Sequence, residues 1–248
     1  MKNSSLFEDK SNLYAASRPL YPDALFEYAA SLVDSHQTAW DCACGNGQAA
    51  IGLIQHFDHV EATDISQNQI ANGFANKKIS YSVQPAEKTT FQDNQFDLVN
   101  VALALHWFDL DKFWPEVHRV LKPNGVFIAY TYAWFQVTQE IDEAIDKHIR
   151  SIIYPYWAPN NKLCWDGYRS IQFPFEKIDT PAFELNMEWN FEQYMNYLHT
   201  WSATRRCMND LGTTFFEQAK QAILKVWGHP ADKKPIKSPL TVIVGYRW

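Results

Sequence analysis

The chain has 248 residues, of which 46% are hydrophobic and 20% are charged, and its formal net charge is −6. This composition is typical of a protein with a sizeable buried core and argues against intrinsic disorder. Because phosphate binding depends on clustered lysine and arginine, the acidic balance disfavours nucleic acid as a partner. The length fits one large α/β domain with an appended cap.

No apolar stretch approaches the roughly 20 residues that a membrane-spanning helix needs. The first ten residues also lack the apolar segment of a secretory signal. We therefore expect no membrane partner and a cytoplasmic location. The cysteines Cys42, Cys44, Cys164 and Cys207 have no metal-ligand spacing with histidines, so we expect reduced thiols and no metal site.

Strands and helices alternate through the first half of the chain. A helix is predicted from Pro22 to about Leu32, and others at about residues 47–56, 66–76, 109–121 and 138–152. Ser66 and Asp109 are suitable N-cap residues for two of these helices. The alternation predicts a parallel sheet with right-handed crossovers.

The pattern changes at about residue 154, where prolines and aromatic residues predict an ordered loop. A strand at about 183–189 is predicted to return to the sheet, followed by helices at about 191–200 and 214–227. Residues 240–246 are strongly β-forming and are predicted to lie within the sheet. Residues 130–168 hold nine aromatic residues, which predicts a cap core that also contributes to an apolar pocket.

The turn at residues 40–50 carries the clearest functional signal. Asp41 ends a predicted strand, and Gly45 and Gly47 lie where that strand turns into a helix. Glycines there allow a ligand to approach the backbone N–H groups. Asp64 ends the next strand 19 residues beyond Gly45, which is near the spacing that brings a carboxylate to ribose hydroxyls. The turn therefore predicts an adenosine-containing ligand.

Gly45-x-Gly47-x-x-Ala50 also fits the relaxed dinucleotide fingerprint, so an NAD(P)-dependent oxidoreductase stays open as an alternative. The position of Asp41, four residues before the first glycine, instead resembles motif I of class I S-adenosylmethionine-dependent methyltransferases. Ala43 stands where that motif has its first glycine.

Four further segments resemble the same family in the same order, and together with motif I they cover about residues 38–132. They are Pro85-Ala86-Glu87, Phe96–Ala102, Ala104–Phe108 with its His-Trp-Phe turn, and Val120–Phe127. Tyr14-x-x-x-Arg18-Pro19-x-Tyr21 and Tyr197–Ser202 resemble the trans-aconitate methyltransferase-like subgroup of the type 11 methyltransferase domains.

The resemblance implies an α/β fold, a doubly wound Rossmann-like seven-stranded sheet with strand 7 antiparallel, plus a helical and aromatic substrate cap. The chain is then a single methyltransferase domain over residues 1–248. Its expected parts are an N-terminal lid segment at 1–35, a cofactor-binding core at 36–135, cap elements at 153–235 and a final sheet strand at 238–248.

The implied cofactor is S-adenosylmethionine and the implied product is S-adenosylhomocysteine. Cofactor contacts are expected from the loops that follow the strands, namely Asp41, Ala43, Gly45, Gly47, Asp64, Ile65, Ala86, Glu87, Ala102 and Leu103. Substrate contacts are expected from the lid, the His-Trp-Phe turn and the cap, namely Tyr14, Arg18, Tyr21, His106, Trp107, Trp134, Trp201 and Arg205.

These observations predict a methyltransferase that acts on a small molecule. A carboxylate is one candidate acceptor, because arginines such as Arg18 and Arg205 would bind it and an ionised carboxylate needs no base. For other acceptors, His106 is the candidate general base. A non-catalytic S-adenosylmethionine-binding protein is the remaining alternative, and the oligomeric state stays open.

Overall fold

The computed structural model describes residues 19–247. Its central sheet has the strand order β3-β2-β1-β4-β5-β8-β6. The strands are β1 (Thr38–Cys42), β2 (His59–Asp64), β3 (Ile79–Val83), β4 (Phe96–Ala102), β5 (Leu121–Thr131), β6 (Glu176–Lys177) and β8 (Lys234–Tyr246). Strands β1 to β5 pair in parallel, whereas β8 is antiparallel to β5 and β6. The predicted fold class is confirmed.

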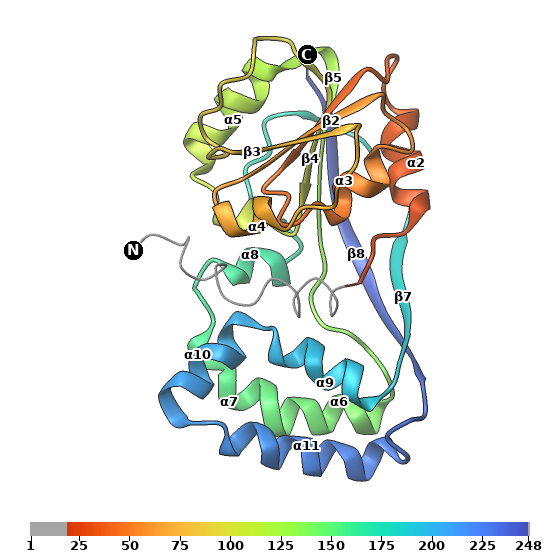
Figure 1. The fold of residues 1–248 in the computed structure, drawn as a ribbon, viewed down its shortest axis with the longest axis vertical. Helices are drawn as coiled ribbons and strands as arrows, with labels where there is room; N and C mark the ends of the chain where they lie inside the picture. The colour runs from red at the N-terminus through yellow and green to blue at the C-terminus, as the bar shows by residue number, and fades with distance from the viewer. Residues whose placement is uncertain (1–18, 248) are drawn as a thin grey trace.

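Helices cover both faces of this sheet (Figure 1). Helices α2 (Asp23–Ser31) and α3 (Gln48–Leu53) lie on one side, and α5 (Leu110–Val120) lies on the other. The short α4 (Gln67–Ala71) follows β2. It ends earlier than predicted, because the Phe74 N–H donates to the Asn46 carbonyl instead of continuing the helix.

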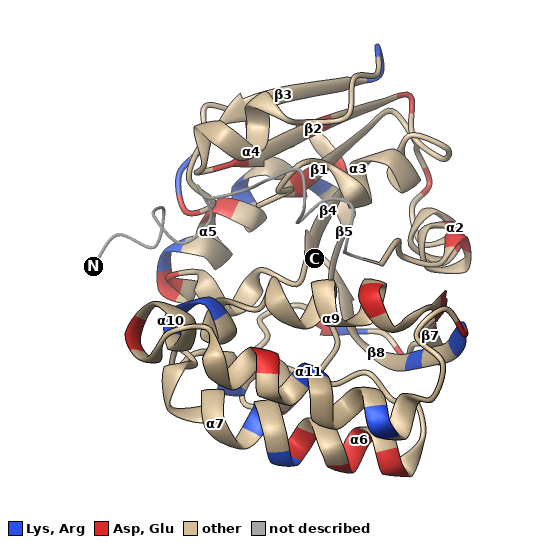
Figure 2. Cartoon of the chain, turned by 60° about the horizontal axis from the view of Figure 1, so that its bottom comes forward, with Lys and Arg blue, Asp and Glu red and all other residues tan. Residues whose placement is uncertain are grey.

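A second group of helices forms a layer beyond one end of the sheet (Figure 1). The elements of this layer are α6 (Gln139–Ile145), η3 (Asp146–Arg150), α7 (Ser151–Ile153), α9 (Phe191–His199), α10 (Ser202–Leu211) and α11 (Thr214–Trp227). The helix predicted at 138–152 is continuous and consists of α6, η3 and α7, of which η3 is a π-helical turn. Helices α8 (Asn161–Trp165) and α10 were not predicted. Figure 2 shows acidic and basic residues mixed along α6 and α11, as on a solvent-facing surface.

Buried strands separate two apolar cores, one on each face of the sheet. Trp40 of β1 belongs to the core under α5, together with Phe113 and Phe127, whereas its neighbour Ala39 belongs to the core under α2 and α3. The Trp40 indole N–H donates to Thr63 Oγ1 at 2.9 Å, so this buried ring has its polar atom satisfied. None of the helices in residues 19–247 is long and apolar enough to cross a membrane.

The strand predicted at 183–189 is present as β7 (Phe183–Trp189) and joins the sheet only through β8, off the main strand order. It pairs with the first half of β8, from Lys234 to Leu240, and β6 takes the place beside the second half. The first half of β8 was not predicted as a strand, because Pro235 and Pro239 lack backbone donors. Both prolines are tolerated because this half of β8 extends beyond β5.

The amino end of β4 is held by a buried carboxylate. Asp97 Oδ2 accepts the N–H groups of Gln37 and Thr38 at 3.1 and 2.9 Å, and Oδ1 lies 2.8 Å from Lys122 Nζ. The Asp97 side chain is 4% exposed. It therefore ties the start of β1 to β4 and β5.

Asp97→Ala should lower the free energy of unfolding by about 3 kcal/mol, because it leaves a partly buried ammonium and two amides without their acceptor. Asp93→Ala is the matched control, since Asp93 is 70% exposed where it pairs with Arg119, and such pairs contribute about 0–1 kcal/mol. Urea denaturation of both variants measures the difference. Equal losses would show that the Asp97 contacts contribute little.

Candidate functional site

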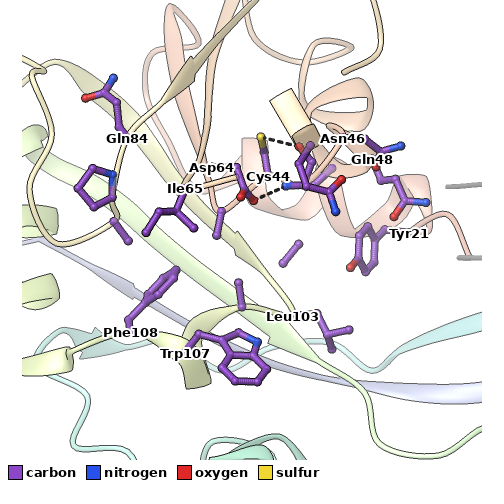
Figure 3. A pocket seen from close by; sticks show the side chains of 18 of the residues that line it. Tyr21, Cys44, Asn46, Gln48, Asp64, Ile65, Gln84, Leu103, Trp107 and Phe108 are labelled. Atoms are coloured by element: carbon purple, nitrogen blue, oxygen red, sulfur yellow. Dashed lines mark hydrogen bonds between the residues drawn. The ribbon is translucent and has the colours of Figure 1, made fainter. Parts of the chain in front are cut away.

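A cavity of about 610 Å³ opens at the carboxyl ends of the parallel strands (Figure 3). Ligands of open α/β sheets bind at this edge. The lining residues come from the ends of β1, β2, β3 and β4 and the segments that follow them, and from Pro19, Tyr21 and Tyr132. The volume lies within the range of about 300–1,000 Å³ that is usual for small-molecule sites.

Most of the predicted cofactor residues line this cavity. They are Ala43, Gly45, Asp64, Ile65, Ala86, Glu87, Ala102 and Leu103, whereas Asp41 and Gly47 do not line it. Of the predicted substrate residues, Tyr21 and Trp107 line it, and His106, Trp134, Trp201 and Arg205 do not. Tyr14 and Arg18 lie outside the described residues. The roles of all these residues in binding stay predictions.

Sequence reasoning missed several other lining residues, namely Cys44, Asn46, Gln48, Gln69, Gln84, Phe108 and Tyr132. Phe108 and Ile65 flank the same part of the cavity, and Trp107 and Leu103 lie further along it (Figure 3). Phe108 could have been found, since it completes the His-Trp-Phe turn. The polar residues carry no comparable sequence signal.

Asp64 joins two of the loops that form the cavity. The Gly45 N–H donates to Asp64 Oδ2 at 2.9 Å, and the Ser66 N–H donates to Oδ1 at 2.8 Å. Burial raises the pKa of Asp64, and these two hydrogen bonds act in the opposite direction. The carboxylate therefore fixes the loop after β1 against the start of α4.

Asp41 is fully buried near the end of β1. Its Oδ1 accepts the Asn100 side-chain N–H at 2.8 Å. Burial raises the pKa of Asp41 to about 7, with the negative charge of Asp64 adding to the shift and the Asn100 and Ala50 hydrogen bonds opposing it. Without a bound ligand, Asp41 therefore keeps its proton up to about neutral pH.

His106 lies in the short helix η2 (Leu105–Trp107) and is 5% exposed. Its Nδ1 is 2.9 Å from Cys164 Sγ, and its backbone carbonyl accepts the Asn160 side-chain N–H at 2.7 Å. Burial lowers the pKa of His106 to about 3, which makes the imidazole a weak base. It also does not line the described cavity, and its role as a general base stays a prediction.

The predicted aromatic pocket residues form a cluster within the cap. The ring centroid of Trp134 lies 5.3 Å from that of Trp201, 5.5 Å from that of Trp165 and 6.0 Å from that of Trp157. The Arg150 guanidinium lies 5.0 Å from the Trp134 centroid. These rings pack against one another beyond the end of β5, where Trp201 is buried and Trp134, Trp157 and Trp165 are half-buried.

Residues 40–129 match the family described as Methyltransferase domain. A protein of Dictyostelium discoideum assigned as a methyltransferase is 30% identical over an alignment of 233 positions, which covers 89% of this chain and 87% of that protein. A solved structure assigned as a type II methyltransferase of Anaeromyxobacter dehalogenans is 33% identical, with a TM-score of 0.86, and covers 93% of this chain and 98% of its own.

The chain belongs to the class I S-adenosylmethionine-dependent methyltransferases. S-adenosylmethionine is therefore its cofactor and S-adenosylhomocysteine its product. A structure from Anabaena variabilis with 15% identity and a TM-score of 0.55, covering 91% of this chain and 98% of its own, shares the fold. The nicotinamide oxidoreductase and the non-catalytic binding protein are thereby set aside, and the trans-aconitate subgroup stays a prediction.

The two glycines of the methyltransferase motif meet different constraints. Gly45 has φ +57° and lines the cavity, and a Cβ there would meet only Gln69 Oε1 at 3.9 Å. Gly47 has φ +90° and does not line the cavity, and a Cβ there would overlap the Tyr81 hydroxyl and ring. Gly45 thus keeps space open for a ligand, whereas Gly47 makes room for Tyr81 of β3.

Gly47→Ala should lower the free energy of unfolding by about 3 kcal/mol, from left-handed strain and overlap with Tyr81. Gly45→Ala should cost about 1 kcal/mol, from strain alone, but should weaken S-adenosylmethionine binding because its methyl group enters the cavity. Adding Tyr81→Leu should recover part of the loss in Gly47→Ala only. Urea denaturation measures the free energy of unfolding, and calorimetry measures the affinity for S-adenosylmethionine. An equal loss of stability in Gly45→Ala and Gly47→Ala would contradict the different roles given to the two glycines.

Asp41→Asn should change how stability depends on pH in the absence of cofactor. A folded-state pKa raised to about 7 means that the stabilising contribution of Asp41 is present below pH 3.8 and is lost as the pH rises toward 7. Asparagine does not titrate, so the free energy of unfolding of the variant should rise relative to that of the wild type as the pH increases across this window. The rise should be at most about 1.4 kcal/mol per pH unit. Denaturation at pH 4 to 8 measures it, and a constant difference would show that Asp41 ionises normally.

Proposed function

We propose that this methyltransferase acts on a small molecule with a largely apolar body, which binds at the end of the cavity formed by Tyr21, Leu103, Trp107 and Tyr132. The observation that carries the proposal is the lining of the cavity. The polar side chains of the lining are those of Asn46, Gln48, Asp64, Gln67, Gln69, Gln84 and Glu87, and its other side chains are apolar or aromatic. Small-molecule sites combine such surfaces with few polar groups.

The cofactor would lie along the strand ends. Asp64 suits the ribose because its carboxylate is fixed beside Gly45. Ile65 and Phe108 face the same space and would enclose the adenine, with Glu87 nearby. Glu87 Oε1 already accepts the Asp109 N–H at 3.0 Å, so its position is also defined. This arrangement leaves Ala102 and Leu103 facing the sulfonium.

Methyl transfer would proceed by in-line attack of the acceptor on the sulfonium methyl group. The chain would contribute by holding the two reacting atoms about 3 Å apart in a cavity that excludes water. Aromatic faces such as Trp107 also favour the positive sulfonium. No step requires the protein to form a covalent bond.

The acceptor should react without a strong base from the protein. His106 is buried away from the described cavity, and Asp64 and Glu87 already accept backbone N–H groups. A carboxylate meets this condition because it is ionised at neutral pH, and a weakly basic amine meets it because its lone pair is free at that pH, whereas an alkylammonium group or a phenol, each with a pKa of about 10, would need a base. A carboxylate would need a cation, and among the described lining residues none is lysine or arginine. Arg18 or Arg205 would then have to contribute.

The test is a methyl-transfer screen of apolar carboxylic acids, amines and phenols at pH 6 to 9, after calorimetry has measured S-adenosylmethionine binding. Turnover should occur with carboxylic acids or weakly basic amines, and Trp107→Ala should raise the acceptor KM at least several-fold while cofactor affinity stays within about 2-fold. Turnover confined to phenols or to macromolecules would overturn the proposal.

A further inference from the structure

Helix α4 begins with a sequence that resembles a capping box. Ser66 is its N-cap, and Ser66 Oγ accepts the Gln69 N–H at 3.3 Å. In a complete Ser-x-x-Gln box, the glutamine side chain reaches back to accept the N–H of the N-cap residue. Gln69 stands in that position.

Helix α9 contains the complete arrangement within the same chain. The Gln193 N–H donates to Asn190 Oδ1 at 2.9 Å, and the Asn190 N–H donates to Gln193 Oε1 at 3.0 Å. In α4 the second bond is replaced, because the Ser66 N–H donates to Asp64 Oδ1 instead. The side chain of Gln69 is therefore not used for capping.

The Gln69 side chain lines the cavity and is 5% exposed. Its Oε1 is buried and has no hydrogen-bond partner among the described residues. Oε1 lies 3.9 Å from where a Cβ on Gly45 would be, and the Gly45 N–H is bonded to Asp64. A buried acceptor without a donor is unfavourable, so this position points to a donor on the ligand.

We propose that Gln69 is a further cofactor-binding residue, whose amide oxygen accepts a hydrogen bond from a ribose hydroxyl of S-adenosylmethionine beside Asp64. The inference rests on the proposed placement of the ribose at Asp64. The ribose presents two neighbouring hydroxyl donors, and each Asp64 oxygen already accepts one backbone N–H. Gln69 supplies a second, neutral acceptor without placing another charge next to Asp64.

The experiment measures the affinity for S-adenosylhomocysteine and for its 2′-deoxy and 3′-deoxy analogues by calorimetry. Gln69→Leu should weaken S-adenosylhomocysteine binding by about 3- to 10-fold. The same variant should bind one of the deoxy analogues as well as the wild type does, because that analogue lacks the donor. Gln55→Leu is the matched control, since Gln55 is exposed and does not line the cavity.

Gln69→Glu covers the case in which Gln69→Leu does not fold, since it keeps an acceptor and should still distinguish S-adenosylhomocysteine from that deoxy analogue. An equal loss for all three ligands in Gln69→Leu, or no loss, would overturn the assignment of Gln69. Failure of the wild type to bind S-adenosylhomocysteine would instead reject the proposed cofactor site, and the role of Gln69 with it.

Discussion

The Asp64 carboxylate is the interaction on which the cofactor end of the cavity depends. It accepts the N–H groups of Gly45 and Ser66, which belong to the loops after β1 and β2. Because both bonds favour the charged form against the cost of burial, the carboxylate is held in place before any ligand arrives. Because the Ser66 N–H donates to Asp64, the Gln69 side chain does not accept that N–H as it would in a complete capping box. One side chain thus sets the positions of both groups proposed to bind the ribose.

Strand β8 connects this cofactor region with the cap. Its second half pairs with β5, and its first half pairs with β7 beyond the sheet. Strand β5 ends at Thr131, next to Tyr132 of the cavity, and Trp134 begins the aromatic cluster two residues later. The cap is therefore held to the sheet by continuous hydrogen-bonded strands. Changes in the cap would then leave undisturbed the loops that we propose to hold the cofactor.

Local spacing was enough to predict the sheet, the turn at Gly45 and the acid at Asp64, because strand ends and helix starts are set by neighbouring residues. The resemblance to the methyltransferase family, rather than spacing alone, pointed to Ile65, Ala86 and Leu103, which line the cavity. Local spacing could not show that Gly47 serves Tyr81, since that contact spans 34 positions of the chain. Likewise, the Cys164 contact that accompanies the burial of His106 depends on α8, a helix of five residues without a clear sequence signal.

The charges around the cavity favour one state of the cofactor over the other. The charged side chains among its described lining residues are Asp64 and Glu87, both acidic. S-adenosylmethionine carries a sulfonium that S-adenosylhomocysteine lacks, and opposite charges attract strongly where water is excluded. Methyl transfer removes that positive charge, so the product loses part of the attraction that held the substrate form. With the cofactor placed as we propose, the acidic lining would favour binding of the methyl donor and release of the demethylated product.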